Sequence, residues 1–150
     1  MTEASDVERA ERIGRSRARL FAFQGLLFMI WQTTFFTAPA HATLRTVDTV
    51  KISAWLVWAV LLLVLLATGG GLLRGKAVRA LLDDELTRRN RTHAYIAGFW
   101  AAVLSAIAVY FIGMFEVVTG REAIHLILSI AIGTAMFVFG MRERRSGKLG

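Results

Sequence analysis

The sequence predicts an all-α polytopic membrane protein whose four transmembrane helices form a bundle. Of its 150 residues, 18 are Lys or Arg and 11 are Asp or Glu, yet four long apolar runs contain none of these charges. The runs cover residues 20–37, 52–73, 94–115 and 123–141. At about 1.5 Å rise per residue, each run matches a hydrocarbon core of about 30 Å. The hydrophobic content of 55% and the mean hydropathy of +0.53 exceed what a soluble domain tolerates.

The apolar runs are uninterrupted and do not alternate between polar and apolar residues. Because lipid offers no hydrogen-bond partner to an open backbone, we expect helices rather than barrel strands to cross the membrane. The chain has no cysteine, which excludes disulfide exchange and thiolate ligands.

The distribution of Lys and Arg predicts the orientation. Fifteen of them lie in the segments 1–19, 74–93 and 142–150, and only three lie in the two remaining connections. Because positive charge resists export, both termini should be cytoplasmic in a bacterial inner membrane. These basic residues border apolar runs and lack the features of a nucleic-acid-binding module, so we expect anionic lipid headgroups, not nucleic acid, as their partners.

The segment 1–19 starts with a capping-box pattern, Ser5 followed by Glu8, and then has apolar residues at helical spacing. This pattern favours a short interfacial helix leading into the membrane, with a disordered tail as the alternative. The domain organisation is therefore a cytoplasmic segment 1–19, a transmembrane domain 20–141 and a basic tail 142–150.

The first apolar run has a polar stripe. Gln24 and Gln32 lie eight residues apart, with Trp31 near the same helical face. Amides in a membrane interior favour contact with other helices, either as polar glue or as part of a ligand site facing the third run. In the second run, Trp55 and Trp58 are expected to anchor the outer interface, and Gly69 to Gly71 indicate a frayed or kinked helix end.

The pattern of the connection 74–93 predicts an amphipathic helix continuous with the third run. Its charged residues are candidates for contact with a cytoplasmic partner: Asp84, Glu85, Arg88, Arg89 and Arg91. The segment 84–91, followed by Phe99-Trp100, resembles a motif of small uncharacterised bacterial inner-membrane proteins in which an Asp-Glu-Arg run precedes a Phe-Trp span. Leu86 stands where Arg is usual in that motif. The resemblance covers about twenty residues and implies an inner-membrane protein with a regulatory or stress-associated role.

Small residues recur at spacings of four in the third and fourth runs. The positions expected to pack helices or join copies of the chain are Gly98, Ala101, Ala102, Ser105, Ala106, Ser129 and Gly133. Such patterns permit close helix approach in membranes. We therefore expect the third run to be the centre of the bundle and to form an antiparallel hairpin with the fourth.

No residue pattern indicates catalysis or a cofactor. His41, His93 and His125 are too scattered for a zinc or haem site, so no catalytic residue, metal or cofactor is assigned. Small multidrug exporters need a Glu within their first helix, where this chain has Gln24 and Gln32. His125 follows Glu122 by three residues, a pairing that suits either pH sensing or, more simply, helix capping and headgroup contact.

These observations predict a non-enzymatic structural, accessory or regulatory membrane protein. It would act through helix association, as a homo-oligomer or with a membrane protein partner. The alternative is a small-molecule or lipid binding or transport protein with its site among the transmembrane helices, around Gln24, Trp31 and Gln32.

Overall fold

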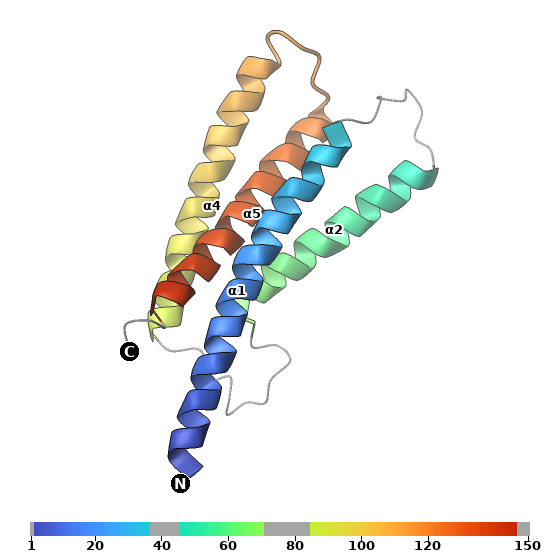
Figure 1. The fold of residues 1–150 in the computed structure, drawn as a ribbon. Coiled ribbons are helices and arrows are strands. Elements are labelled where there is room, and N and C mark those ends of the chain that lie inside the picture. The colour runs from blue at the N-terminus through green and yellow to red at the C-terminus, as the bar shows by residue number, and fades with distance from the viewer. Residues whose placement is uncertain (1, 37–45, 71–84, 147–150) are drawn as a thin grey trace.

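A computed structural model describes residues 2–36, 46–70 and 85–146, which contain four helices and no strand. The helices are α1 (Thr2–Phe36), α2 (Thr46–Ala67), α4 (Glu85–Ile112) and α5 (Gly120–Ser146) (Figure 1). Side chains are described for residues 14, 16–32, 49–70 and 85–146. The all-α prediction is confirmed. Within the described residues, three helices (α2, α4 and α5) are long and apolar enough to cross a membrane.

Helix α1 is one continuous element of 35 residues, about 52 Å long at 1.5 Å per residue. The predicted interfacial helix and the first apolar run are therefore a single helix and not two elements. Arg, Ala and Leu predominate at the junction, residues 17–20, and no proline interrupts the helix there. The N-terminal part of α1 extends beyond the other helices (Figure 1).

Helix α2 ends earlier than its apolar run predicts, at Ala67 rather than at residue 73. Gly70 N–H donates to Leu65 O at 2.9 Å and Gly69 N–H donates to Leu66 O at 3.2 Å. These two bonds form a Schellman motif, which requires a left-handed residue after the helix. Gly69 supplies it with φ of 58°, and Gly70 follows with φ of 74°. The glycines thus end the helix, which agrees with the interpretation of Gly69 to Gly71 as a helix end.

Helix α5 lies at the centre of the assembly, with α1 and α4 packed along it and α2 in smaller contact. The prediction that the third run would be the centre is therefore wrong, because α5 has small residues on two sides. A Cβ atom added to Gly140 would lie 2.6 Å from Ala18 O of α1. On the other side, a Cβ atom added to Gly98 of α4 would lie 3.0 Å from Ala131 O. Both neighbours of α5 thus approach its backbone closely.

The apolar core lies between α1, α2 and α5. Its largest fully buried side chains are Phe28, Leu62, Leu66, Met136 and Phe139. Phe21 packs edge-on against Phe139 with ring centroids 4.9 Å apart, and Phe28 does the same against Trp58 at 5.2 Å. Edge-to-face packing suits aromatic rings because their positive edges meet negative faces.

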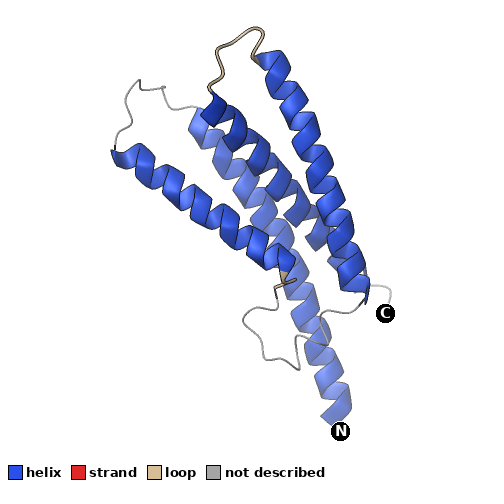
Figure 2. Cartoon of the chain, turned by 180° about the vertical axis from the view of Figure 1, so that it is seen from behind, coloured by secondary structure: helices blue, strands red, loops and turns tan. Residues whose placement is uncertain are grey.

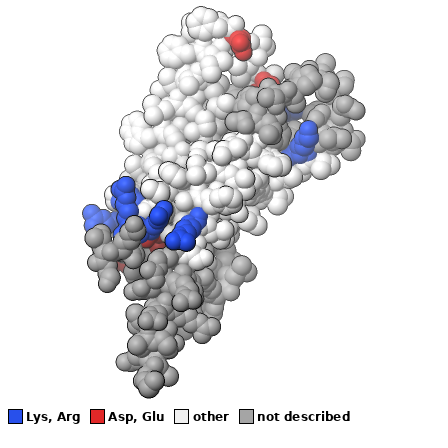
Figure 3. All heavy atoms as spheres, in the orientation of Figure 1, with Lys and Arg blue, Asp and Glu red and all other residues white. Residues whose placement is uncertain are grey.

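The helices converge near the C-terminus of α5 and diverge toward the other end. Figures 1 and 2 show the N-terminal part of α2 leaning away from α1 and α5. Helices α4 and α5 are joined by residues 113–119 and pack against each other, so the predicted antiparallel hairpin is confirmed. In Figure 3, basic side chains gather around the convergent end, and a broad uncharged zone follows.

Candidate functional site

The convergent end contains a polar cluster drawn from all four helices and buried around Arg17 and Asn90, which we call the Arg17 cluster. Its members are Arg17 of α1, Gly69 after α2, Asn90 and Arg91 of α4, and Glu143 and Ser146 of α5. Arg17 forms an ion pair with Glu143, and its Nη1 donates to Gly69 O at 3.1 Å. Asn90 Nδ2 donates to Glu143 Oε1 and to Ser146 Oγ, both at 3.3 Å.

Burial makes the Arg17 cluster energetically important. The side chains of Arg17 and Glu143 are only 7% and 10% exposed. A charge removed from water is tolerated when a partner and further hydrogen bonds satisfy it, and both conditions hold for the Glu143 carboxylate. Asn90 is itself buried, at 4% exposed. The cluster therefore ties α1, α4 and α5 together at one level.

The cluster also satisfies the C-terminal end of α2. Carbonyl groups in the last turn of a helix lack partners within the helix and carry partial negative charge. Arg17 donates to Gly69 O, and Arg91 donates to Ala67 O. Two guanidinium groups from different helices thus meet the negative end of α2. These bonds join the end of α2 to α1 and α4, in addition to the apolar packing of Leu62 and Leu66 in the core.

This cluster was not predicted from the sequence. In the sequence, Arg17 and Glu143 belong to charge runs that indicate topology, and Asn90 belongs to the amphipathic connection. A signal was available: Thr87, Asn90, Ala94 and Gly98 recur at spacings of three and four, so a polar Asn continues the small-residue stripe of the third run. All four are buried in the structure.

A second polar cluster, the His125 cluster, lies nearer the divergent end. It comprises Gln32 of α1, Trp55 of α2, and His125 and Ser129 of α5. His125 Nε2 is bonded to Gln32 Oε1, and the His125 ring lies 4.3 Å from that of Trp55 between centroids. Trp55 Nε1–H donates to Ser129 Oγ at 3.2 Å, and Ser129 Oγ–H donates to His125 O at 2.6 Å. This cluster has no acidic or basic member apart from the imidazole.

The outcome corrects two predictions. Trp55 was expected to anchor a membrane interface but is only 8% exposed and belongs to the core. The alternative of a ligand site placed Gln32 toward the third run, but α1 packs on α5, so the Gln32 amide meets His125. Trp31 is 55% exposed and has its ring 6.4 Å from that of Trp58, so it lies outside the His125 cluster.

The first run's amides are incompletely satisfied. Gln32 is 4% exposed, and its Nε2 has no hydrogen-bond partner in the described part of the chain. Gln24 Oε1 is likewise buried without a partner there. A flip of the Gln32 amide would exchange its nitrogen and oxygen and leave the other atom unmatched. Unmatched buried amide atoms are costly, which makes this face of α1 a place where a further polar group would be stabilising.

The Ser129 and His125 side chains do not form a nucleophile and base pair. Such a pair needs the hydroxyl to donate to the imidazole. Here the hydroxyl donates to the backbone carbonyl of His125 instead. Among the residues that the structure describes, no group of three His, Cys, Asp or Glu side chains could hold a metal ion.

Glu122 caps the start of α5. Its Oε2 accepts from Thr119 N–H at 2.9 Å and from Thr119 Oγ1 at 2.8 Å, while Glu122 N–H donates to Thr119 Oγ1 at 3.3 Å. This is a reciprocal capping box. The bond from the backbone of Thr119, followed by that from its hydroxyl, lowers the pKa of the Glu122 carboxyl from its ordinary value of 4.5. Glu122 therefore caps the helix, whereas His125 turns inward.

The small residues of the third and fourth runs divide into two groups. Gly98, Ser105, Ser129 and Gly133 are buried within the single chain. Ala101 and Ala102 are half-buried, and Ala106 is exposed. Ser105 Oγ bonds to Ala101 O of its own helix at 2.8 Å. Only part of the small-residue surface is thus used for internal packing.

The charged connection is described from residue 85 onward, so Asp84 lies outside the described residues. Glu85, Arg88 and Arg89 are exposed at the N-terminal end of α4. Arg91 is half-buried and is directed to α2 as a member of the Arg17 cluster. The expected contact of this connection with a partner stays a prediction, and Arg91 has a structural role within the chain.

Comparison of the chain with protein-family models, curated proteins and solved structures finds no match in any of the three. The features that bear on function are therefore the two polar clusters and the surface of α4.

Proposed function

We propose that the chain is a non-enzymatic bacterial inner-membrane protein that acts by helix association, with four spans and both termini in the cytoplasm. Support for four spans comes from the apolar run 20–37 within α1, in addition to α2, α4 and α5. The lopsided distribution of basic residues supports the orientation. In this topology the Arg17 cluster lies at the cytoplasmic boundary and the His125 cluster lies in the outer half.

One stripe of α4, exposed except at the half-buried Ala102, supports the association proposal. It consists of Tyr95, Phe99, Ala102, Ala106 and Tyr110, which lie within about 80° of the helix circumference at 3.6 residues per turn. The two alanines form a notch between large aromatic side chains: Phe99 is 63% exposed and Tyr110 is 71% exposed. A small-residue notch allows a second helix to approach closely, and aromatic neighbours provide contact area around it. We propose a second copy of the chain as the partner.

The test compares Ala106→Leu with Ala108→Leu. Both alanines are exposed on α4, but Ala108 lies on the opposite side of the helix. Filling the notch should weaken dimerisation by about tenfold, the cost of an overpacked contact. Ala108→Leu should leave dimerisation unchanged. Single-molecule photobleaching in dilute liposomes measures the dimer fraction, and unfolding in mixed micelles checks that both variants fold.

Gly98→Leu does not test association, because Gly98 packs against Ala131 and Ala135 of the same chain. A wild-type chain that stays monomeric at high protein density in the bilayer would contradict the proposal. Equal dimer fractions for wild type and Ala106→Leu would contradict it as well.

A second function, binding of a small molecule or lipid among the helices, is supported by the unmatched amide atoms of Gln24 and Gln32. The group that would satisfy them is a neutral ligand with both donor and acceptor atoms, because no charged side chain belongs to the His125 cluster. A screen of quinones, haem, lipids and hydrophobic cations by thermal unfolding in detergent tests this function, since a ligand of the native state raises stability. Stabilisation that is lost in Gln32→Leu would support it. No stabilisation by any compound would count against it.

A further inference from the structure

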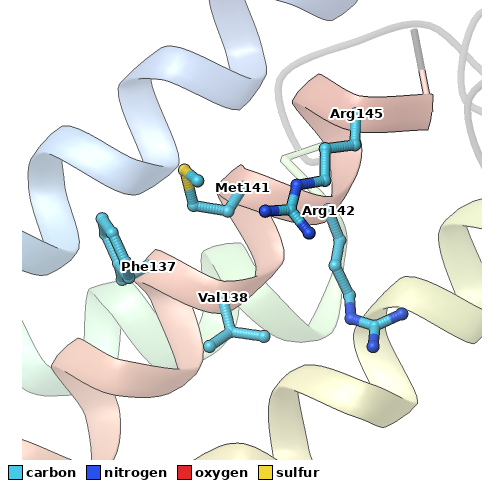
Figure 4. Close-up of a pocket in the computed structure, with 5 residues that line it drawn as sticks. All are labelled: Phe137, Val138, Met141, Arg142 and Arg145. Carbon is cyan, nitrogen blue, oxygen red and sulfur yellow. The ribbon is translucent and has the colours of Figure 1, made fainter. Parts of the chain in front are cut away.

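A hollow of about 230 Å³ lies on the last three turns of α5, and it is open rather than enclosed. The residues that line it are Phe137, Val138, Met141, Arg142 and Arg145. Figure 4 shows Phe137 and Met141 on the side toward α1, Arg142 reaching toward α4, and Arg145 further along the helix. At 3.6 residues per turn, these residues share one arc of about 140°. The buried residues Phe139 and Gly140 lie on the opposite side of α5.

The hollow is cationic at one end and apolar at the other. Arg142 and Arg145 are both exposed. Glu143, the acidic residue within this basic run, points to the other side of α5, where Arg17 and Asn90 hold its carboxylate. The Arg17 cluster thus removes the nearest negative charge from the hollow. Two guanidinium groups remain at its rim, with no carboxylate among the described residues that line it.

The polarity of the hollow follows the membrane normal. Phe137 and Val138 lie inside the apolar run 123–141, whereas Arg142 and Arg145 follow its end. The distance along the helix from Phe137 to Arg145 is about 12 Å. A phospholipid has the same order of groups over that distance: acyl chain, glycerol and then phosphate. A free anion would leave the apolar half empty, and an acidic peptide would have to enter below the headgroups to fill it.

We propose that this hollow binds one anionic phospholipid from the leaflet at the Arg17 end. The phosphate lies between Arg142 and Arg145, where it accepts charge-assisted hydrogen bonds from both guanidinium groups. The first acyl carbons pack on Phe137, Val138 and Met141. The site differs from general attraction of basic residues to a membrane surface, because it saturates at one lipid per chain and depends on two particular arginines.

Native mass spectrometry of the purified full chain, titrated with phosphatidylglycerol or phosphatidylcholine, tests the proposal. One phosphatidylglycerol should be retained in preference to phosphatidylcholine. Arg142→Gln and Arg145→Gln should each reduce this preference by about fivefold, the expected contribution of one basic residue near an anionic surface. The matched control is Arg144→Gln, which removes an exposed arginine from the same run outside the hollow. It should leave the preference unchanged.

Two further arms identify the bound group. Inorganic phosphate and an acidic peptide should fail to displace the retained lipid at concentrations at which short-chain phosphatidylglycerol succeeds. The proposal would be overturned by equal losses in Arg144→Gln and Arg142→Gln, which would indicate diffuse attraction. Displacement by phosphate or by the peptide, or equal retention of both lipids, would overturn it too.

Discussion

The Arg17 cluster and the His125 cluster hold the same helices in different ways. The Arg17 cluster is ionic and involves all four helices. The His125 cluster is built from neutral donors and acceptors and involves only α1, α2 and α5. Helix α4 has no buried residue between Ser105 and its end at Ile112. The molecule is therefore tightly joined at one end and loosely joined at the other.

The difference follows from the medium in which each cluster lies. A buried ion pair is tolerated where water and headgroups lie within reach of its outer atoms, as at the boundary of an apolar run. Farther into the bilayer, an unmatched charge costs more. The His125 cluster accordingly uses neutral amide, hydroxyl and indole groups instead of an ion pair. We therefore expect substitutions in the Arg17 cluster to lower the stability of the fold more than substitutions in the His125 cluster.

The largest effect is expected from Glu143→Leu. This change leaves the Arg17 guanidinium buried without its carboxylate, and removal of one partner of a buried pair costs about 3 to 5 kcal/mol. Unfolding in mixed detergent and SDS micelles measures the loss. The double variant Arg17→Met and Glu143→Leu should recover much of it, because no unmatched charge remains. If the double variant is less stable than Glu143→Leu, the unmatched-charge explanation is wrong.

The next effect concerns the close contact of α1 with α5 beside the Arg17 cluster. Gly140→Ala places a Cβ atom 2.5 Å from Ala22 N and should cost about 1 to 3 kcal/mol through overpacking. Gly14→Ala is the matched control, because no described atom lies within 4 Å of a Cβ atom there. It should be neutral or stabilising, since Ala favours a helix more than Gly does. Similar losses of stability in both variants would contradict the close contact of Gly140 with the backbone of α1.

A smaller effect is expected at the neutral end. Ser129→Ala removes the acceptor of Trp55 Nε1–H and should cost about 1 kcal/mol, as is usual for interhelical hydrogen bonds in membranes. Ser105→Ala is the control, because the Ser105 hydroxyl bonds only to the backbone of its own helix in the described structure. The same unfolding measurement compares the two. If Ser105→Ala loses more stability than Ser129→Ala, the hydrogen bond from Trp55 to Ser129 does not stabilise the fold as proposed.

The smallest effect concerns the exposed cap of α5, ahead of the apolar run. The Glu122 carboxyl has a lowered pKa in the folded state, so its contribution is present above the ordinary value of 4.5 and is lost as the pH falls through the lowered value. Amide hydrogen exchange of the first turn of α5 should therefore show less protection at acidic pH. Glu122→Gln should remove this pH dependence. Unchanged pH dependence in that variant would contradict the role of the carboxylate.

The periodicity of the sequence was sufficient to predict the helices. It was insufficient to predict which helices pack against each other. The apolar runs predicted helices but not all of their ends. Helix α2 ends before its run does, because hydropathy does not detect the left-handed turn at Gly69, and α1 starts at Thr2, well before its run. Within the small-residue stripes, Gly98 and Gly133 lie at helix contacts. They could not indicate which helix lies opposite, because a glycine accommodates any neighbour that approaches closely.

The candidate sites were predicted in part. Gln32 was recognised as a polar group facing protein, but its partner His125 lies 93 residues away in sequence. The Arg17 and Glu143 pair is separated by 126 residues and was hidden among charges that also mark topology. A single basic residue at a membrane boundary looks the same in sequence whether it binds a headgroup or a buried carboxylate. Only the packing of α1 on α5 shows that Arg17 binds a buried carboxylate and not a headgroup.

The amino-acid sequence alone determined that the chain is helical and built for a membrane, because the exclusion of charge from long apolar runs and the period of a helix are local properties. The tertiary structure decided that α5 is central, that the ionic cluster closes one end, and that Glu143 leaves two arginines at an open hollow. These features depend on which glycine faces which backbone. That choice arises from the packing of whole helices, and no single segment encodes it.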